Sequence, residues 1–304
     1  MRFWSHDHHG FPLPEGHRFP LPKYRLLREA VERAGLGEVC HSEAAPWELL
    51  AAVHEQDYLD RVRDGELTRR EERALGLPWS TELVERGRRS TGGTVDAARD
   101  ALETGLGMNL GGGTHHAAHA QGRGYCLFND VAVAVVAMRE ERALGRVLVV
   151  DCDVHQGDGT AELFAADPDT FTLSIHGGAN YPFHRATSDL DVDLRSGTGD
   201  GEYLAALDDA LARAVPAARP EVVFYLAGAD PWEGDRLGRL SLTKPGLRSR
   251  DALVLDTAQQ AGAATCVVLA GGYAPDVRDT VEINLATVRA VAGRARRAGA
   301  PLGA

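Results

Sequence analysis

Short apolar runs alternate with longer apolar or amphipathic segments from about residue 90 to the end of the chain. Short β-branched runs predict buried strands, and longer segments with a helical period predict helices. The predicted strands cover residues 108–111, 146–152, 170–176, 221–227 and 264–270. The predicted helices cover residues 80–105, 128–144, 159–166, 200–213, 247–261 and 276–297. This alternation indicates an α/β fold with a central, mostly parallel sheet and helices on both of its faces.

The chain is expected to form a single domain over residues 1–304. Its length suits one large α/β domain or two smaller ones, and we find no repeat, low-complexity stretch or linker that would divide it. Residues 1–80 are expected to be a mostly helical part of the same domain. Residues 299–304 are expected to be a frayed tail.

Composition and charge narrow the classes of function. The hydrophobic content of 44% suffices for a large core, and the net charge of −11 argues against general binding to nucleic acids. Negative charge mildly favours cationic substrates but says nothing about the site. Cys126, Cys152 and Cys266 lie in or beside apolar runs and are expected to be reduced core thiols. We see no signal peptide and no apolar run of ~20 residues, so we expect a cytoplasmic protein without membrane contact, of unknown oligomeric state.

The polar segment after the apolar run 147–150 is the strongest chemical signal in the chain. Asp151, Asp153 and His155 alternate, so an extended backbone would point all three side chains to one side. One imidazole with one or two carboxylates at the end of a strand is a plausible ligand set for a divalent metal ion. The alternative is an Asp-rich turn that caps the next helix, a role for which Asp158 alone would suffice.

Three other apolar runs also end in unusual polar groups. They lead to the pair His115-His116, to Asp230 and to Tyr273. Ligands of open α/β sheets bind beyond the carboxyl ends of the strands, so these groups are expected to converge. For both histidines to serve one site, they must lie on a turn, which the glycines at 111–113 permit. A histidine that acts as a base also needs a carboxylate partner, and Asp151 and Asp158 are available.

With these residues assembled, the chain resembles the histone deacetylase family, which shares its fold with arginases. The matching segments occur in the family's order: 113–117, 124–130, 151–159, 229–230 with 235–238, and 271–273. Gln156 stands where many members carry a second histidine, and together with the short N-terminal segment it resembles the bacterial class IV-like branch. Polyamine-deacetylating and acetoin-utilisation members are close relatives.

The resemblance implies that Asp153, His155 and Asp230 hold one Zn²⁺, which acidifies a water molecule in the open coordination position. Because the ligands are hard, Fe²⁺ could replace Zn²⁺. The family also binds a monovalent cation, K⁺ or Na⁺, beneath the metal strand. The matching positions for this cation are Asp151, Asp153, His155, Ser174 and Ile175.

The resemblance also implies the catalytic roles. His116, paired with Asp158, would act as general base and then as general acid towards the leaving amine. His115, paired with Asp151, would supply electrostatic support. Tyr273 would donate a hydrogen bond to the carbonyl oxygen in the transition state.

Gly124, Tyr125 and Leu237 are expected to line the substrate tunnel. Either Tyr181 or Phe183 is expected to supply a further tunnel aromatic, and the spacing leaves that choice open. The expected substrate is an acylated amine that carries an acetyl or longer acyl group, as in acyl-lysine peptides or proteins. Acetylated polyamines and small-molecule amides are alternatives.

Two other activities are less favoured. An arginase-like enzyme with two metal ions needs additional carboxylates beside each ligand motif, and the segment 230–235 has none at the next alternate position. A non-catalytic metal-binding protein is expected to lack His116 or Tyr273, and both are present. The histidines at positions 6, 8 and 9 could bind a metal ion adventitiously, but they are expected to lie in a solvated, flexible segment.

Overall fold

A computed structural model describes residues 1–142 and 144–298; the expected frayed tail lies outside the described residues. In the described residues the central sheet has six strands, all parallel, in the order β3-β8-β7-β4-β5-β6. This confirms the predicted α/β fold with a central parallel sheet. Its strands are β3 (Leu106–Met108), β4 (Val147–Asp151), β5 (Thr170–Gly177), β6 (Leu190–Leu194), β7 (Val222–Leu226) and β8 (Ala264–Val268).

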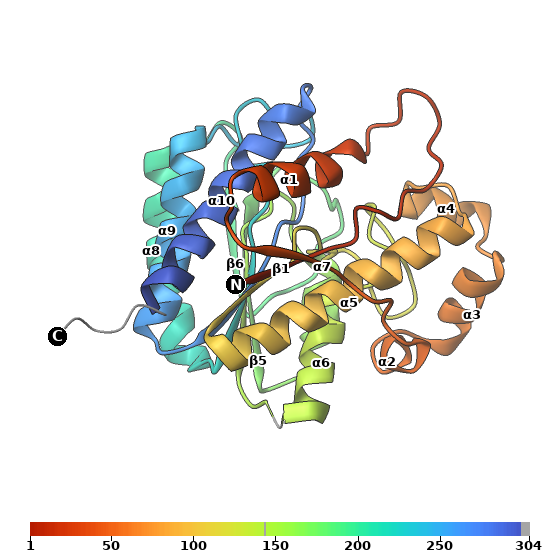
Figure 1. The fold of residues 1–304 in the computed structure, drawn as a ribbon, viewed down its shortest axis with the longest axis horizontal. Helices are drawn as coiled ribbons and strands as arrows, with labels where there is room; N and C mark the ends of the chain where they lie inside the picture. The colour runs from red at the N-terminus through yellow and green to blue at the C-terminus, as the bar shows by residue number, and fades with distance from the viewer. Residues whose placement is uncertain (143, 299–304) are drawn as a thin grey trace.

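Helices cover both faces of this sheet. On one face lie α8 (Asp200–Ala218), α9 (Lys244–Gln260) and α10 (Val277–Ala298), and on the other lie α5 (Thr81–Thr104) and α6 (Asp130–Arg142) (Figure 1). The shorter α7 (Asp158–Phe164) follows β4.

The core is split by the sheet into two apolar layers. Along β4, Leu148 and Val150 belong to one layer, whereas Val147 and Val149 belong to the other. This alternation is the period of a strand that is buried on both faces. Four consecutive apolar residues in the sequence therefore fix a central strand, and the polar residues after it emerge at its carboxyl end.

The N-terminal part adds a small sheet that the sequence pattern did not predict. In it, β1 (Arg2–Ser5) pairs in parallel with β2 (Glu38–His41). The helices of this part are α1 (Pro22–Arg33), α2 (Trp47–Ala51), α3 (Gln56–Asp64) and α4 (Arg69–Leu75). Helix α1 packs against α10.

Two further details of the sheet differ from the predictions. The strand expected at residues 108–111 is β3, which starts and ends earlier, because the glycines that follow it form a turn. The edge strand β6 was missed, since in Leu190–Leu194 only the last residue is buried.

Within the described residues, no helix has both the length and the apolar character needed to span a membrane.

Candidate active site

The polar segment after β4 leaves the strand at its first carboxylate. Because β4 ends at Asp151 and residues 152–156 turn, the expected alternation along one extended strand is wrong beyond Asp151. The turn nevertheless brings Asp153 and His155 to Asp230, which follows β7. One ligand atom of each of these three residues lies within 4.8 Å of the others, and all three side chains are buried. We call Asp153, His155 and Asp230 the candidate metal ligands.

The candidate metal ligands fit a divalent cation. Burial and the nearby Asp153 carboxylate raise the pKa of Asp230 to about 7, because two anionic groups share a site shielded from water. Asp230 Oδ2 has no hydrogen-bond partner among the described residues. His155 Nδ1 lies 2.9 Å from Asp153 Oδ1 and 3.4 Å from Asp230 Oδ2, so the three donors face one point. A cation at that point would compensate the two carboxylates, and the donor set suits Zn²⁺ or Fe²⁺.

Gly271 keeps this point open. Its backbone N–H donates a hydrogen bond of 2.8 Å to Asp153 Oδ2. A β-carbon at position 271 would overlap the Asp230 carboxylate. Only glycine therefore allows the backbone after β8 to approach the candidate metal ligands so closely.

The two adjacent histidines lie on a turn after β3, where the glycine run was expected to allow one. Gly112 and Gly113 have φ angles of 74° and 76°, in the region that glycine adopts readily. The buried Asp130, at the start of α6, accepts hydrogen bonds from the N–H groups of Gly113 and Thr114 at 2.9 and 2.7 Å. The buried Asp130 carboxylate thus holds the backbone of the loop that leads to His115 and His116.

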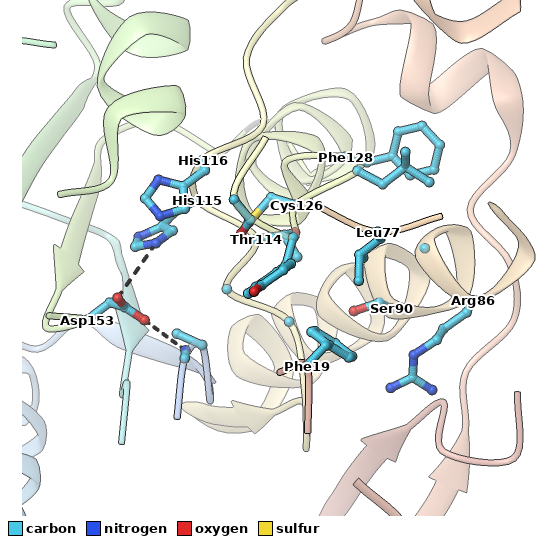
Figure 2. Close-up of a pocket in the computed structure, with 18 of the residues that line it drawn as sticks. Phe19, Leu77, Arg86, Ser90, Thr114, His115, His116, Cys126, Phe128 and Asp153 are labelled. Atoms are coloured by element: carbon cyan, nitrogen blue, oxygen red, sulfur yellow. Dashed lines mark hydrogen bonds and ion pairs between the residues drawn. The ribbon is translucent and has the colours of Figure 1, made fainter. Parts of the chain in front are cut away.

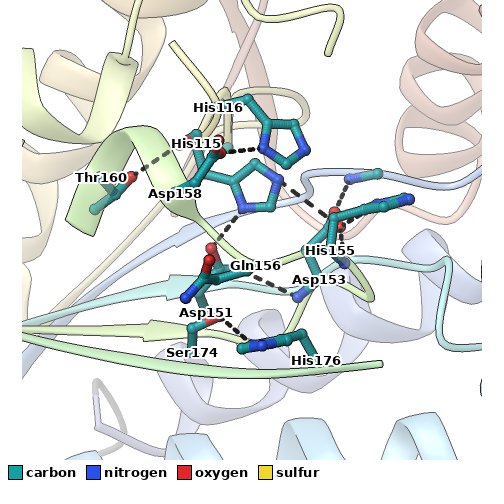
Figure 3. Close-up of polar contacts among 12 residues, drawn as sticks. His115, His116, Asp151, Asp153, His155, Gln156, Asp158, Thr160, Ser174 and His176 are labelled. Atoms are coloured by element: carbon teal, nitrogen blue, oxygen red, sulfur yellow. Dashed lines mark hydrogen bonds and ion pairs between the residues drawn. The ribbon is translucent and has the colours of Figure 1, made fainter. Parts of the chain in front are cut away.

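Each histidine pairs with a different buried carboxylate (Figure 3). His115 Nδ1 lies 2.5 Å from Asp151 Oδ2, and His116 Nδ1 lies 2.6 Å from Asp158 Oδ1. Burial alone would lower the pKa of His115, but the carboxylates of Asp151 and Asp153 outweigh it and raise the pKa to about 9. Burial and the neighbouring His115 lower the pKa of His116 to about 4, although Asp158 opposes them. The His116 ring is therefore neutral and able to accept a proton at Nε2.

The backbone of Tyr273 is fixed by Asp235. One oxygen of this carboxylate accepts a hydrogen bond of 2.6 Å from the Tyr273 N–H, and the other accepts from the N–H groups of Leu237 and Gly238 at 2.8 and 3.0 Å. Burial and the two carboxylates among the candidate metal ligands raise the pKa of Tyr273 well above its ordinary value. Its phenol therefore stays protonated and can donate a hydrogen bond.

Two cavities meet beside the candidate metal ligands. The inner cavity runs past the histidine turn to apolar walls that include Leu77 and Phe128, with Arg86 on the side away from His116 (Figure 2). The outer cavity, of about 530 Å³, has its rim at exposed residues. The residues that line both cavities form a neck between them: His116, Gly124, Tyr125, His155 and Tyr273.

The other expected tunnel residues lie on the outer side of this neck. The Tyr181 ring lies 4.9 Å from the His116 ring and 6.4 Å from the His155 ring, measured between centroids. Phe183 is 85% exposed and lies at the rim of the outer cavity, which Leu237 also lines. Of the two aromatic candidates, Tyr181 is therefore the one beside the candidate metal ligands.

Gln156 connects the segment that carries Tyr181 to the central sheet. Its side-chain nitrogen donates hydrogen bonds to the Ala186 carbonyl at 2.9 Å and to Asp191 Oδ1 at 2.8 Å. Asp191 belongs to β6, and Ala186 lies in the segment that carries Tyr181 into that strand. Gln156, which stands where many family members carry a second histidine, thus forms hydrogen bonds with β6 and with the segment before it.

Of the positions expected to hold a monovalent cation, Asp151, Ser174 and Ile175 lie on the neighbouring strands β4 and β5. Ser174 and Ile175 are on β5, and Ser174 pairs with Asp151 across β4 and β5. Ser174 Oγ lies 2.9 Å from Nδ1 of His176. Burial and Arg185 lower the pKa of His176 to about 4, so this neighbour is uncharged. The hydroxyl and carboxylate oxygens gathered here are donors that suit a hard cation.

Sequence reasoning missed His54 as a support of the site. His54 Nδ1 donates a hydrogen bond of 2.9 Å to the Ala118 carbonyl, and its Nε2 accepts one of 3.0 Å from the Asn129 N–H. The ring thereby joins the segment after His115 and His116 to the start of α6. His54 lies outside the segments that resemble the family, so no motif marked it. Asp130 and Asp235 lie within those segments, and the resemblance could have pointed to them.

Of the N-terminal histidines, His6 differs from the expectation of a solvated segment, whereas His8 is exposed and His9 partly exposed. His6 is buried, with 3% of its surface exposed. Asp7, His8 and His41 form a second group with the spacing of metal ligands at the carboxyl ends of β1 and β2. The Asp7 carboxylate in this group already pairs with Arg28 at 2.9 Å. We therefore assign no metal ion to it.

Comparisons with known proteins agree with the geometry. The family model described as "histone deacetylase domain" matches residues 17–288. An uncharacterized protein of Picosynechococcus sp. is 42% identical, with 91% of this chain and 93% of the relative covered. Histone deacetylase 2 of Arabidopsis thaliana is 33% identical, with 76% of this chain and 62% of the relative covered. A histone deacetylase-like amidohydrolase of Pseudomonas aeruginosa is 29% identical, with 86% and 74% covered.

Solved structures show the same fold. A histone deacetylase homologue complexed with SAHA superimposes with a TM-score of 0.85 at 23% identity, over 96% of this chain and 83% of that one. The HD domain of HDA15 gives a TM-score of 0.80 at 23% identity, over 96% of this chain and 88% of that one. These superpositions confirm the single-domain deacetylase-like fold, and together with the match over residues 17–288 they show that the chain belongs to the histone deacetylase family of hydrolases.

Proposed function

We propose that this protein is a metal-dependent deacylase that hydrolyses the amide bond of an acylated amine such as acyl-lysine. The observation that carries the proposal is the buried cluster of Asp153, His155 and Asp230, which lies at the neck beside His116 and Tyr273. When bound, a divalent ion supplies Lewis acidity for hydrolysis. We propose Zn²⁺, with Fe²⁺ as the alternative, and K⁺ or Na⁺ at the neighbouring oxygen donors.

In this proposal His116 moves the proton. Its neutral Nε2 takes a proton from the attacking water and later gives it to the amine nitrogen when the C–N bond breaks. Asp158 fixes the ring by accepting from Nδ1–H and is itself approached by Arg123 at 3.1 Å. His115, held by Asp151, adds positive charge close to the reacting carbonyl.

Tyr273 has the role of oxyanion donor. The hydroxyl is kept protonated by its surroundings, and the backbone is fixed through Asp235. Its hydrogen bond to the carbonyl oxygen strengthens as negative charge develops there, which is the interaction that lowers a reaction barrier.

The two cavities orient the substrate. The amine-bearing part of a peptide is too large for the interior and has to remain in the outer cavity, so the carbonyl occupies the neck and the acyl chain points inward. Leu77, Leu83 and Phe128 supply apolar walls on that side. We therefore propose that acyl groups longer than acetyl are accepted, since each buried methylene contributes up to ~0.8 kcal/mol.

A panel of substrates tests this function. The metal-loaded protein is incubated with lysine peptides that differ only in acyl length, from acetyl to decanoyl, and with acetylated diamines. We expect release of the free amine from the peptides, with kcat/KM constant or rising from acetyl to medium chains. Complete lack of turnover by a metal-loaded sample, or equal turnover after removal of the metal, would contradict the proposal.

A further inference from the structure

The rim of the outer cavity carries positive charge although the protein as a whole is acidic. Three arginines line this cavity, namely Arg18, Arg236 and Arg239, and all three are exposed. Among the described residues, no aspartate or glutamate lines it. The local charge thus opposes the net charge of −11 of the whole chain.

These three arginines come from separate parts of the chain. Arg18 belongs to the segment before α1, whereas Arg236 and Arg239 stand on either side of Leu237-Gly238 in the loop that follows β7. Aromatic rings, including the 85% exposed Phe183, lie on the same rim. A substrate that enters the neck passes all of these side chains, because the outer cavity is continuous with the neck.

The charges of the rim arginines are uncompensated. Arginines nearby are held in ion pairs: Arg123 by Asp158 and Glu162, and Arg185 by Asp193. By contrast, the rim arginines form no ion pair with any residue in the described ranges 1–142 and 144–298, and Arg236 makes only one bond, of 3.3 Å, to the Pro275 carbonyl.

The loop contains three carboxylates, Asp230, Glu233 and Asp235, and among the described residues none of them forms an ion pair with a rim arginine. Asp230 is a candidate metal ligand, and Asp235, the neighbour of Arg236, is already engaged. Asp235 accepts three backbone hydrogen bonds, from Leu237, Gly238 and Tyr273, and these hold it away from the guanidinium groups. An arginine without a carboxylate partner keeps its fork of donors free for an incoming carboxylate. A cationic amine at the same place is repelled.

From this rim we infer the substrate class: acyl-lysine that is flanked by aspartate or glutamate in a peptide segment. The inference rests on the proposed deacylase function and names its substrate. Acetylated polyamines carry positive charge on the part that remains in the outer cavity, so Arg18, Arg236 and Arg239 select against them. A lysine within a basic segment is disfavoured for the same reason.

Three matched peptides provide the test. Each contains one acyl-lysine, flanked on both sides by glutamate, by serine or by arginine, and N-acetylputrescine is added as a fourth substrate. We expect kcat/KM to be about tenfold or more higher for the acidic than for the basic peptide, mainly through KM. The ratio is expected to shrink towards one as salt is raised from 20 mM to 500 mM, about the range over which the Debye length falls severalfold.

Variants assign the effect to the rim. The triple variant Arg18→Glu, Arg236→Glu, Arg239→Glu is expected to reverse the order of the acidic and basic peptides while it still turns over the serine peptide. Arg289→Glu on α10 replaces an exposed arginine that does not line the cavity, and it should behave like the unmodified protein. Fluorescence anisotropy of the labelled peptides measures the same preference as binding, independently of turnover.

The outcomes are distinguishable. Equal kcat/KM and equal affinity for the three peptides, a preference for N-acetylputrescine, or an acidic preference that survives in the triple variant would each overturn the inference. If no substrate is hydrolysed, the proposed function fails, and the anisotropy data still decide whether the rim selects acidic peptides.

Discussion

His115 and His116 are neighbours in the sequence, yet their free ring nitrogens face different groups. Through Nδ1, His115 pairs with Asp151 and His116 with Asp158. The His115 Nε2 atom lies 3.8 Å from Asp153 Oδ1, a candidate metal ligand, whereas His116 forms part of the neck where the substrate carbonyl is placed. This difference supports the proposal that His116 transfers the proton and that His115 supplies a supporting charge.

His116→Ala is expected to reduce turnover by about 10²–10⁴-fold without loss of bound metal, because proton transfer and not coordination is removed. His115→Ala should reduce turnover less. Elemental analysis of each variant, run beside single-turnover kinetics, separates the two effects. Wild-type turnover by both variants would exclude this acid–base scheme.

The hydroxyl of Tyr273 is expected to matter more in the transition state than in the ground state. Tyr273→Phe should lower kcat by about 10²-fold or more, with little change in affinity for an unreactive substrate analogue. Tyr125→Phe is the matched control, because Tyr125 lines the same neck and its ring lies 5.8 Å from that of Tyr273. A parallel loss of kcat and analogue affinity would argue against an oxyanion role.

The sequence predicted which side chains meet at the site better than it predicted how they are held there. Polar groups after buried strands had to converge, since the carboxyl ends of parallel strands share one edge of the sheet. The hydrogen bonds of Asp130 to the histidine turn and of His54 to Ala118 depend on contacts between distant segments, about which local patterns say nothing.

At the scale of loops, one carboxylate positions two walls of the site. Asp235 accepts from the N–H of Tyr273 and from the N–H groups of Leu237 and Gly238. Asp235→Ala removes the carboxylate that accepts all three bonds. We expect a loss of kcat of about 10- to 100-fold at unchanged metal content, because a shift of ~1 Å in a catalytic group has an effect of that size. Asp276→Ala is the control, since the side chain of this partly exposed residue bonds to the nearby Arg278 at the start of α10 and to no other described residue. Equal kcat in the two variants would show that Tyr273 is held by other contacts.

Between elements, His54 makes the stability of the fold depend on pH. Burial lowers the pKa of His54 to about 4, although the bond to the Ala118 carbonyl opposes it. The unfolded chain takes up the proton below its ordinary pKa of 6.5, whereas the folded chain does so only near pH 4. The contribution of the neutral ring is therefore complete above pH 6.5 and is lost as the pH falls towards 4.

Urea unfolding of the unmodified protein and of His54→Gln, both in chelator, measures this contribution. The stability advantage of the unmodified protein should shrink by about 3 kcal/mol between pH 7 and pH 4. Other titrating groups are common to both chains and cancel in the difference. A difference that stays constant over this range would mean that His54 has the same pKa in the folded and the unfolded chain.

For the whole molecule, the sequence predicted the central architecture and missed the periphery. Fully apolar runs such as 147–150 predict strands that are buried on both faces. Parallel strands joined by helices can be connected in only a few ways, so the number of possible sheet arrangements was small. The edge strands β1, β2 and β6 have mixed surroundings and short lengths, so their apolar pattern is too weak to recognise. The two large cores on either side of the sheet are built from apolar side chains, so the fold is expected to survive removal of the metal.

Removal of the metal should nevertheless lower the stability of the whole domain. An ion present at about 1,000 times its Kd stabilises the folded state by ~4 kcal/mol, and chelation removes that contribution.

Asp230→Asn should abolish the metal-dependent rise in Tm. In chelator at pH 8, this variant should have a higher Tm than the unmodified protein, because burial and Asp153 disfavour the charge on Asp230. The asparagine can still accept the bond of 3.0 Å from the Val154 N–H. Calorimetry with chelator and with Zn²⁺ measures both effects, and Asp209→Asn on the exposed face of α8 is the control. An unchanged Zn²⁺-dependent shift in Asp230→Asn would exclude Asp230 as a metal ligand.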